Sequence, residues 1–168
     1  MAQDDADLEP EVAYSSGSIS GEPAGFVDGT EELTDGLRQA AGWSVVGIPI
    51  EMDDPRVSGQ LTFVANGSGQ DFDDGFAKIE SKSYRLENED GAWTGSGDAI
   101  VAVTEDVPLM DLETAVLVGD GEYEGLLAFF FAEFGGDERT FEIVVIEGER
   151  PPVPDPVSAP AVEDVATS

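Results

Sequence analysis

Residues 123–134 read YEGLLAFFFAEF, and they place five aromatic side chains and two leucines in twelve positions of an otherwise acidic chain. Aromatic residues favour β-strands, and the run lacks the alternation of polar and apolar residues that marks a strand with one face in water. As a strand it would have two apolar faces. One would carry Tyr123, Gly125, Leu127, Phe129 and Phe131, and the other Leu126, Ala128, Phe130, Ala132 and Phe134. We therefore predict a strand that is buried on both faces.

The second apolar face of this strand needs a cover. In a closed barrel one face fills the interior, and a contiguous apolar patch left on the outside would favour association. Three hypotheses account for the cover: an interface between copies of the chain, packing beneath a tail or an irregular segment, and a ligand-binding groove. The first of these makes the protein a homo-oligomer, which is the assembly we expect.

The rest of the chain predicts one domain with a tail at each end. A chain of 168 residues is long enough for a single domain with a substantial core, and twenty glycines and ten prolines favour many turns over long helices. Residues 1–11 are acidic with almost no large apolar group, and residues 150–168 are rich in Pro and Ala, so we expect both segments to be tails. The predicted domain spans residues 12–149.

Short β-favouring segments alternate with turn clusters throughout this domain. Residues 56–66, RVSGQLTFVAN, show the clearest alternation, with one apolar face made of Val57, Leu61, Phe63 and Ala65. About eight such segments joined by short polar loops are most simply antiparallel neighbours. We predict an all-β fold, a single antiparallel barrel of about eight strands rather than a sandwich, because closure removes exposed strand edges. Residues 28–41, DGTEELTDGLRQAA, are expected to form the one short helical or irregular connection, with Thr30 as N-cap.

One segment resembles a known family. VLVGDGEYEGLLAFF carries Gly119, Gly121, Tyr123 and Gly125, and it resembles the Gly-x-Gly-x-Tyr-x-Gly segment of the allene oxide cyclase and dirigent-type β-barrels. The segments DPRVSG and YRLEN…GAW are also similar to those of uncharacterised secreted bacterial β-barrel proteins, which imply no activity. The first resemblance implies an eight-stranded antiparallel barrel, often trimeric, whose interior binds an apolar or phenolic molecule. No residue outside the matched segment inherits a functional role.

The net charge limits the partners of the chain. There are 37 Asp and Glu against 7 Lys and Arg, a formal net charge of −30. Nucleic acids and anionic membrane surfaces would be repelled, because binding either of them requires Lys and Arg, and no apolar run approaches the roughly 18 residues of a spanning helix. We expect no nucleic-acid and no membrane partner. The carboxylates are either a solvated surface or a means of binding divalent cations or a cationic ligand, and their even spread favours the surface.

The first ten residues, MAQDDADLEP, contain neither the basic nor the apolar region of a signal peptide. The residues AQDD after the Met would fit a chain end left by signal cleavage. We therefore expect a mature secreted or otherwise extracytoplasmic protein, with a cytoplasmic location as the alternative.

The absence of His and Cys removes most common catalytic chemistry. It excludes disulfides, thiolate nucleophiles and zinc–thiolate sites, together with the usual general base. No cofactor motif is present, so we expect no cofactor.

The segment DFDDG groups three candidate calcium ligands, Asp71, Asp73 and Asp74. It is not an EF-hand loop, since Gly75 is fifth and Lys82 twelfth. An irregular metal site and an ordinary polar turn remain the two interpretations.

Five side chains are candidates for contact with a small ligand: Trp43, Tyr84, Arg85, Trp93 and Phe129. The aromatic rings offer stacking surface, and packing in the core is their alternative role. Arg85 would need a carboxylate partner if it points into the barrel.

Lys78 and Lys82 lie on the opposite face from Arg85 in the predicted strand of residues 76–88, FAKIESKSYRLEN. We interpret them as ion-pair partners on the outer surface. A buried lysine that binds an anion or acts as a base is the alternative.

Three functions are compatible with these features. The first is a noncatalytic β-barrel that binds a small apolar molecule in its lumen, or that associates with copies of itself through residues 123–134. The second is a cyclase or isomerase resembling allene oxide cyclase, which would shape a reactive substrate in a dry cavity without His or Cys. The third is an acidic, cation-binding structural module. We favour the first, because the sequence contains no complete catalytic motif.

Overall fold

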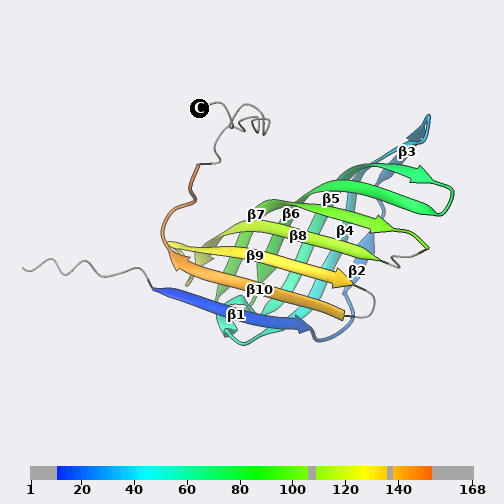
Figure 1. The fold of residues 1–168 in the computed structure, drawn as a ribbon. Coiled ribbons are helices and arrows are strands. Elements are labelled where there is room, and N and C mark those ends of the chain that lie inside the picture. The colour runs from blue at the N-terminus through cyan, green and yellow to red at the C-terminus, as the bar shows by residue number, and fades with distance from the viewer. Residues whose placement is uncertain (1–10, 106–108, 136–137, 153–168) are drawn as a thin grey trace, which may run out of the picture.

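The computed structural model of the chain describes residues 11–105, 109–135 and 138–152. Their secondary structure is almost entirely β (Figure 1). The strands are β1 (Val12–Ile19), β2 (Gly25–Val27), β3 (Thr30–Thr34), β4 (Leu37–Met52), β5 (Gly59–Phe72), β6 (Gly75–Glu87), β7 (Gly91–Val103), β8 (Met110–Gly121), β9 (Leu126–Gly135) and β10 (Glu138–Glu147). One turn of 3-10 helix, η1 (Pro55–Val57), is the single helical element of the described residues.

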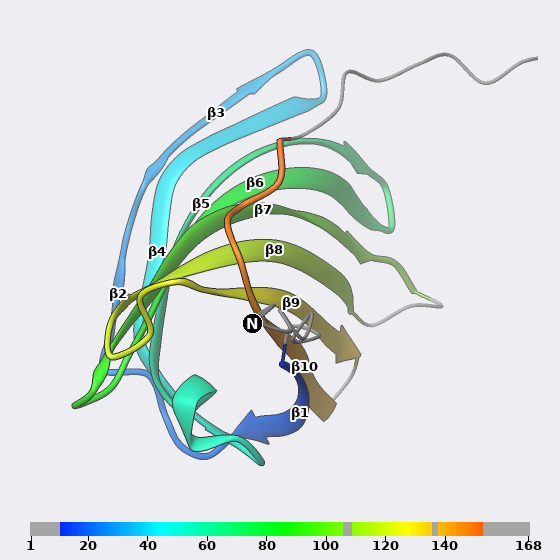
Figure 2. The ribbon, with the colours of Figure 1, turned by 90° about the vertical axis from the view of Figure 1, so that its left-hand side faces the viewer.

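Eight of the strands close into a ring. Neighbouring strands pair antiparallel in the order β1, β10, β9, β8, β7, β6, β5 and β4, and residues 50–52 of β4 then pair with residues 17–19 of β1. Figure 2 looks into this ring, whose strands surround a common interior. The predicted all-β, antiparallel, barrel-like fold is therefore confirmed. The predicted tails fall almost entirely on residues 1–10 and 153–168, which lie outside the described residues.

The two ends of the ring differ. At one end η1 turns inward (Figure 2), and Val57 and Trp93 are fully buried. Trp93 Nε1 donates a hydrogen bond of 2.8 Å to the carbonyl of Arg56, and its ring stacks on Tyr123. At the other end β1 leaves β4, and the short strands β2 and β3 pair with β4 in its place. Among the described strands neither β2 nor β3 pairs with β10, so hydrogen bonds do not close the ring at this end.

Residues 30–41 belong to a β-hairpin, so the prediction of a short helical or irregular connection over residues 28–41, with Thr30 as N-cap, was wrong. β3 pairs with residues 37–41 at the start of β4. The two residues between the strands, Asp35 and Gly36, have φ angles of 51° and 80°. Positive φ at both central positions is the geometry that an Asp-Gly pair favours in a two-residue hairpin turn, and it cannot continue a right-handed helix. The Asp-Gly turn therefore decides the structure of this segment.

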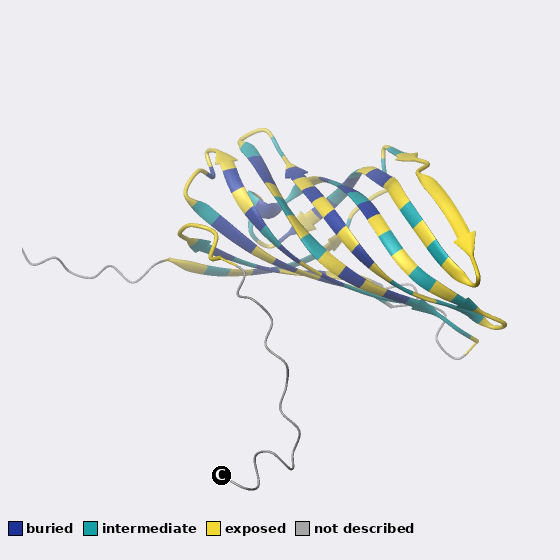
Figure 3. Cartoon of the chain, turned by 90° about the horizontal axis from the view of Figure 1, so that it is seen from above, coloured by how far each residue is buried: buried dark blue, intermediate teal, exposed yellow. Residues whose placement is uncertain are grey.

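Side chains alternate between the interior and the outer surface along the strands, as the bands of buried and exposed residues in Figure 3 show. The interior packs one hydrophobic core. Phe63, Tyr84, Phe130 and Phe141 form a chain of tilted ring contacts within it, with centroids 5.5 to 6.2 Å apart. Burial of each such side chain stabilises the fold by about 1.5–3 kcal/mol. A single core of this kind is the basis of one domain.

Within residues 123–134, β9 begins at Leu126, and its inward face is buried as predicted; residues 123–125 form the turn before it, where a strand was predicted. Phe130 is 3% exposed, and Ala128 and Ala132 are fully buried. On the outer face Leu127 is 1% exposed, but Phe129 and Phe131 are 36% and 37% exposed. Phe129 and Phe131 are therefore partly exposed in a single chain, and burial of the second face by one of the three predicted covers stays a prediction.

The chain after β10 turns back past β9 and β8 toward β7 (Figure 2). Gly148 N donates a hydrogen bond of 3.0 Å to the carbonyl of Gly125, and Arg150 Nη2 is 3.5 Å from Ser96 Oγ on β7. This segment covers at most part of the outer face of β9, because Phe129 and Phe131 remain in contact with solvent.

Candidate functional site

A network of charged side chains lies inside the ring, between β6 and β8. Lys82 on β6 and Glu113 on β8 form an ion pair across β7, and their side chains are 1% and 3% exposed. The pair can form because β7 places only Gly97 and Ala99 at the inward positions between them. Gly97 also lets the backbones of β7 and β8 approach closely, since a Cβ there would collide with the carbonyl of Thr114. Small residues on β7 therefore position the network.

The Lys82 ammonium is held by several groups. It is 3.2 Å from Glu80 and 3.9 Å from Asp111, and it lies over the ring of Phe63, 4.6 Å from the centroid. Burial alone would lower the pKa of Lys82, but the charges of Glu113, Asp111 and Glu80 outweigh burial and raise this pKa above its usual value. Lys82 therefore stays charged, and it depends on its carboxylate partners.

Tyr84 joins the same network from β6. Its hydroxyl donates a hydrogen bond of 2.8 Å to Oε2 of Glu113, and its ring contacts Phe63 and Phe130. Burial and the charge of Glu113 raise the pKa of Tyr84 far above its usual value. The phenol therefore remains protonated and acts as a hydrogen-bond donor.

The interpretation of Lys78 and Lys82 as ion-pair partners on the outer surface was wrong. Their face of β6 also carries Tyr84 and Leu86, which are buried, so the whole face turns inward. The abundance of carboxylates made an outer position reasonable, but carboxylates also lie inside the ring. Arg85 lies on the opposite, outward face, where its Nε donates a hydrogen bond of 2.7 Å to Glu87. Arg85 therefore does not line the interior.

A cavity of about 250 Å³, which we call the mouth cavity, opens at the end of the ring where β2 and β3 replace β1 beside β4. Its wall is built by β1, β2, β4, β5, β8, β9, β10 and the segments next to them. The aromatic lining residues are Phe26, Trp43, Phe63 and Phe134, and the charged ones are Glu22, Asp111, Glu113 and Arg139. The mouth cavity thus meets the interior network at Asp111 and Glu113.

Asp111 is the unusual group of the mouth cavity. Its Oδ1 atom is buried and has no hydrogen-bond partner among the described residues, whereas most buried polar atoms are paired. Burial raises the pKa of Asp111 to about 6, with Lys82 opposing the rise and Glu113 and Glu80 adding to it. An unpaired carboxylate oxygen beside a cavity can accept a hydrogen bond from a bound molecule.

The aromatic lining is partly open to solvent. Trp43 packs on Phe63 with centroids 5.7 Å apart and is 38% exposed, and Phe26 is 64% exposed. On the other side the guanidinium carbon of Arg139 lies 5.9 Å from the ring centroid of Phe134. The aromatic wall of the mouth cavity is therefore accessible to solvent at Trp43 and Phe26.

The structure brings two of the five predicted ligand-contacting residues near this site. Trp43 lines the mouth cavity, and Tyr84 belongs to the adjoining network. Trp93 is buried at the opposite, filled end of the ring. Phe129 and Arg85 lie on the outer surface. A role of these residues in binding stays a prediction.

Asp111 and Glu113 were not predicted as site residues from the sequence, although a signal for them exists. In β8 they alternate with Leu112 and Thr114, and they share their face with the buried Leu117. Acidic residues on the apolar face of a strand indicate that they have partners inside the protein. Residues 104–113 are acidic and contain a proline, which is typical of a loop. In a loop the side chains do not alternate between two faces, so this signal was not applied to Asp111 and Glu113.

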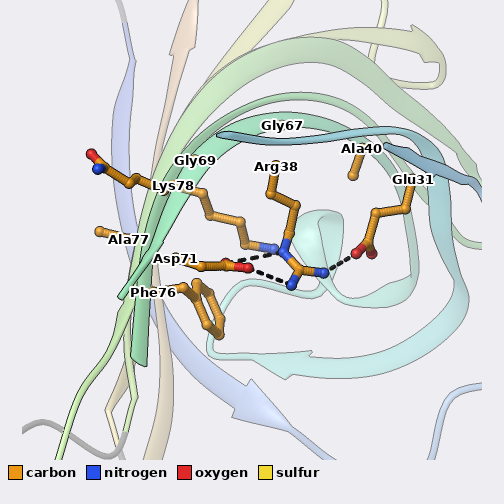
Figure 4. Close-up of a pocket in the computed structure, with 10 residues that line it drawn as sticks. Glu31, Arg38, Ala40, Gly67, Gly69, Asp71, Phe76, Ala77 and Lys78 are labelled. Atoms are coloured by element: carbon orange, nitrogen blue, oxygen red, sulfur yellow. Dashed lines mark hydrogen bonds and ion pairs between the residues drawn. The ribbon is translucent and has the colours of Figure 1, made fainter. Parts of the chain in front are cut away.

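A second cavity, of about 320 Å³, lies beneath the β3–β4 hairpin (Figure 4). The Arg38 guanidinium pairs there with Glu31 and donates two hydrogen bonds, of 2.6 and 3.1 Å, to Asp71. Lys78 extends toward these groups in Figure 4, and its ammonium is 2.6 Å from Glu80. The charged groups of this cavity thus already have ion-pair partners, and they offer a ligand fewer free hydrogen-bonding atoms than Asp111 does.

The candidate metal ligands are not gathered into one site. Asp71 is paired with Arg38, whose hydrogen bonds lower the pKa of Asp71, and Asp73 and Asp74 are exposed at the turn between β5 and β6. Within the part of the chain that the structure describes, no group of three or more acidic side chains could hold a metal ion. A metal site at these residues stays a prediction.

Comparisons with known proteins leave the family open. No family model matches the sequence, and no curated protein and no solved structure matches it. The resemblance to allene oxide cyclase and dirigent-type barrels therefore stays a prediction, as does the extracytoplasmic location. Across residues 11–105, 109–135 and 138–152, no helix has the length and apolar character needed to cross a membrane.

Proposed function

We propose that this protein binds a small, largely apolar molecule in the mouth cavity without transforming it. The proposal is carried by the composition of the cavity, which combines four aromatic side chains with one buried carboxylate oxygen that lacks a partner among the described residues. Ligand pockets typically have such apolar walls and a few polar groups that fix orientation. The volume of about 250 Å³ is below the roughly 300–1,000 Å³ of pockets for drug-sized molecules, so the ligand is smaller than these.

Binding without catalysis is favoured by the state of the interior charges. Lys82 is paired with Glu113 and Glu80, so it is not a free base. Tyr84 donates its hydrogen bond to Glu113, and its raised pKa keeps the phenol protonated. A cyclase or isomerase that used more than the shape of its cavity would need an acid, base or nucleophile aimed at its substrate. Asp111 has one oxygen that is unpaired among the described residues, and we assign this oxygen to orienting the ligand. Lys82 and Tyr84 are instead engaged with Glu113.

The proposal is tested by NMR titration of the isotope-labelled protein with phenethyl alcohol, a small neutral aromatic molecule. The chain has two tryptophans. Trp43 lines the mouth cavity, and Trp93 is buried at the other end of the ring. The indole N–H resonance of Trp43 should move and saturate, and that of Trp93 should stay in place. Movement of neither resonance, or of both equally, contradicts the proposal.

Two neighbouring variants locate the binding site. Phe26 and Val27 are adjacent on β2 and are 64% and 54% exposed, so neither is needed for the core. Phe26 lines the mouth cavity and Val27 does not. Phe26→Ser should weaken binding by about tenfold, through loss of aromatic contact, whereas Val27→Ser should leave the affinity unchanged. Equal affinities of the two variants would place the ligand elsewhere.

Self-association is a second candidate function, favoured by the outer surface of β9 and its neighbours. Phe129, Phe131 and Val118 are 36%, 37% and 39% exposed there, and Val12 and Tyr14 on β1 are 63% and 62% exposed. Strands β1, β10, β9 and β8 are consecutive in the ring, so these side chains lie on one side of it. A second copy of the chain would bury them.

Light scattering at physiological salt tests self-association. The wild-type protein should be an oligomer, and Phe131→Asp should be a monomer. Ile79→Asp is the matched control, because Ile79 is 67% exposed on β6, away from this face, and the oligomer should persist. A monomeric wild-type protein, or an oligomer that survives Phe131→Asp, contradicts association through this face.

A further inference from the structure

We infer that the molecule taken up by the mouth cavity is a small organic cation, an apolar or aromatic skeleton with a protonated amine that donates a hydrogen bond to Asp111. This inference rests on the proposed function and names the ligand class of the same cavity. The charge balance inside the ring, the aromatic lining of the cavity and the net charge of the chain each support it.

The interior of the ring holds more negative than positive charge. Three carboxylates lie near two ammonium groups: Glu80, Asp111 and Glu113 against Lys78 and Lys82. Lys78 is 2.6 Å from Glu80, and Lys82 is paired with Glu113, whereas Lys82 and Asp111 are 3.9 Å apart. Oδ1 of Asp111 has no partner within the described residues. A cationic donor is therefore the group that this position lacks.

The lining of the mouth cavity suits a cation as well as an apolar skeleton. Ammonium and guanidinium groups are attracted to the faces of aromatic rings within about 6 Å. Two cations of the chain already lie in this way beside the cavity, Lys82 at 4.6 Å from the centroid of Phe63 and Arg139 at 5.9 Å from that of Phe134. Trp43 presents the ring type that attracts cations most strongly, and it lines the same cavity. A bound amine would find the same kind of contact.

The charge of the chain favours cations over anions at long range. A net charge of −30 raises the local concentration of cations and lowers that of anions. The lining of the mouth cavity has the same bias, with Glu22, Asp111 and Glu113 against Arg139 alone. Arg139 is exposed, so solvent screens its repulsion of a ligand cation. An anionic ligand that pairs with Arg139 is the alternative to a cation, so the experiment includes an anionic probe.

Binding of a cation should weaken as Asp111 takes up a proton. Burial raises the pKa of Asp111 to about 6, so the affinity for an amine should fall severalfold between about pH 8 and about pH 5. The affinity for a neutral molecule should change little. The other charged and titratable groups that face Asp111 or share its cavity are Lys78, Glu80, Lys82 and Tyr84 from β6, Glu113 from β8, Arg139 from β10 and Glu22 from the segment between β1 and β2.

The experiment compares three probes of nearly equal size in physiological salt. Phenethylamine is protonated at neutral pH, phenethyl alcohol is neutral, and phenylacetate is an anion. Each is titrated into the full chain, and the indole N–H resonance of Trp43 reports binding in the mouth cavity. We expect phenethylamine to bind about tenfold more tightly than phenethyl alcohol, the gain of a charge-assisted hydrogen bond. Phenylacetate should bind least.

Two variants with the same change in net charge separate Asp111 from the general field of the protein. Asp111→Asn should abolish the preference for the amine over the alcohol. Asp98→Asn removes one charge from an exposed position on β7, outside the mouth cavity, and it should leave the preference unchanged. Saturable movement of the Trp43 resonance on titration with the alcohol shows, for each variant, that the cavity is intact.

The outcomes distinguish the ligand class from the binding function. Equal binding of amine and alcohol, or tighter binding of phenylacetate, would overturn the ligand class and leave the proposed binding function standing. A preference for the amine that survives in Asp111→Asn would also overturn the inference, because the overall charge would then explain it. If none of the three probes moves the Trp43 resonance, both the inference and the proposed function are wrong.

Discussion

Glu113 is the residue on which the interior network depends. It pairs with Lys82 and accepts the hydrogen bond of Tyr84, and its own side chain is 3% exposed. Loss of Glu113 would leave an ammonium and a phenol buried without their main partner. The cost of such orphaned groups exceeds the contribution of the intact pair.

Glu113→Ala should lower the free energy of unfolding by about 3–5 kcal/mol, the usual cost of breaking a buried ion pair from one side. Urea denaturation measures this difference. Glu133→Ala is the matched control, because Glu133 is exposed on the outer face of β9, and its effect should stay within about 0.5 kcal/mol. Similar losses in the two variants would show that Glu113 is not buried with its partners.

Asp111 should lower the stability of the protein at neutral pH. Its pKa is raised from 3.8 to about 6 in the folded chain, so the folded state binds the proton more tightly than the unfolded state does. The contribution of Asp111 to stability is therefore fully present below about pH 4 and is lost as the pH rises through about 6. Asp111→Asn should raise the free energy of unfolding at about pH 8 by about 1–2 kcal/mol, allowing for solvent screening.

Urea denaturation of the wild type and of Asp111→Asn at several pH values measures this effect. The gain from the substitution should shrink between about pH 8 and about pH 4, because wild-type Asp111 becomes protonated. A gain that is constant with pH, or a loss at about pH 8, contradicts the raised pKa. A residue that costs stability and yet faces a cavity fits a role in binding better than a role in folding.

At the residue scale, part of the site could be predicted from the sequence. Trp43 and Tyr84 are large and amphipathic, and such side chains are candidates for a pocket wherever they lie. The strand pattern could mark Asp111 and Glu113 alike as inward-facing among the 37 acidic residues, but it could not single out Asp111, because what sets Asp111 apart is an unpaired buried oxygen. That property arises only when β6 and β8 face the same interior.

At the scale of elements, strand alternation predicted most of the fold, and two strands show its limits. In β6 the face with Lys78 and Lys82 was assigned to the outer surface, although Leu86 shares it and is buried. In β3 the polar sequence TEELT has no apolar face, and all five residues are exposed. Only the Asp-Gly turn indicates that this segment is a strand, because its geometry requires a hairpin.

The ion pair between β6 and β8 requires a strand of small residues between them. Gly97→Ala should therefore lower the free energy of unfolding by about 1–3 kcal/mol, since the added Cβ collides with the backbone of β8. Gly25→Ala is the matched control, because nothing lies within 4 Å of a Cβ at Gly25. Thermal or urea unfolding compares the two. Equal stability of both variants would contradict the close approach of β7 and β8.

At the scale of the whole molecule, few cations are present to offset the many carboxylates. Of the seven Lys and Arg, Arg38, Lys78 and Lys82 pair with carboxylates in the interior or beneath the β3–β4 hairpin, and Arg139 lines the mouth cavity. The outer surface is left strongly acidic. Repulsion across such a surface opposes the compact state.

The melting temperature should therefore rise when NaCl is increased from about 10 mM to about 150 mM, which shortens the screening length from about 30 Å to about 8 Å. Differential scanning calorimetry measures this shift. The same salt series near the calculated isoelectric point of 4.1 is the control, because the net charge is small there and the shift should disappear. A melting temperature that falls with salt near neutral pH contradicts a fold limited by charge repulsion.

A crystal structure of the protein grown with phenethylamine would test most directly the central claim, that eight strands enclose a cavity in which Asp111 receives a small organic cation. The predicted result is a ring closed between β1 and β4, with the phenyl group among Phe26, Trp43 and Phe134 and the amine within hydrogen-bonding distance of Asp111. An open sheet, or an amine bound only on the outer surface with the mouth cavity filled by side chains, would contradict it.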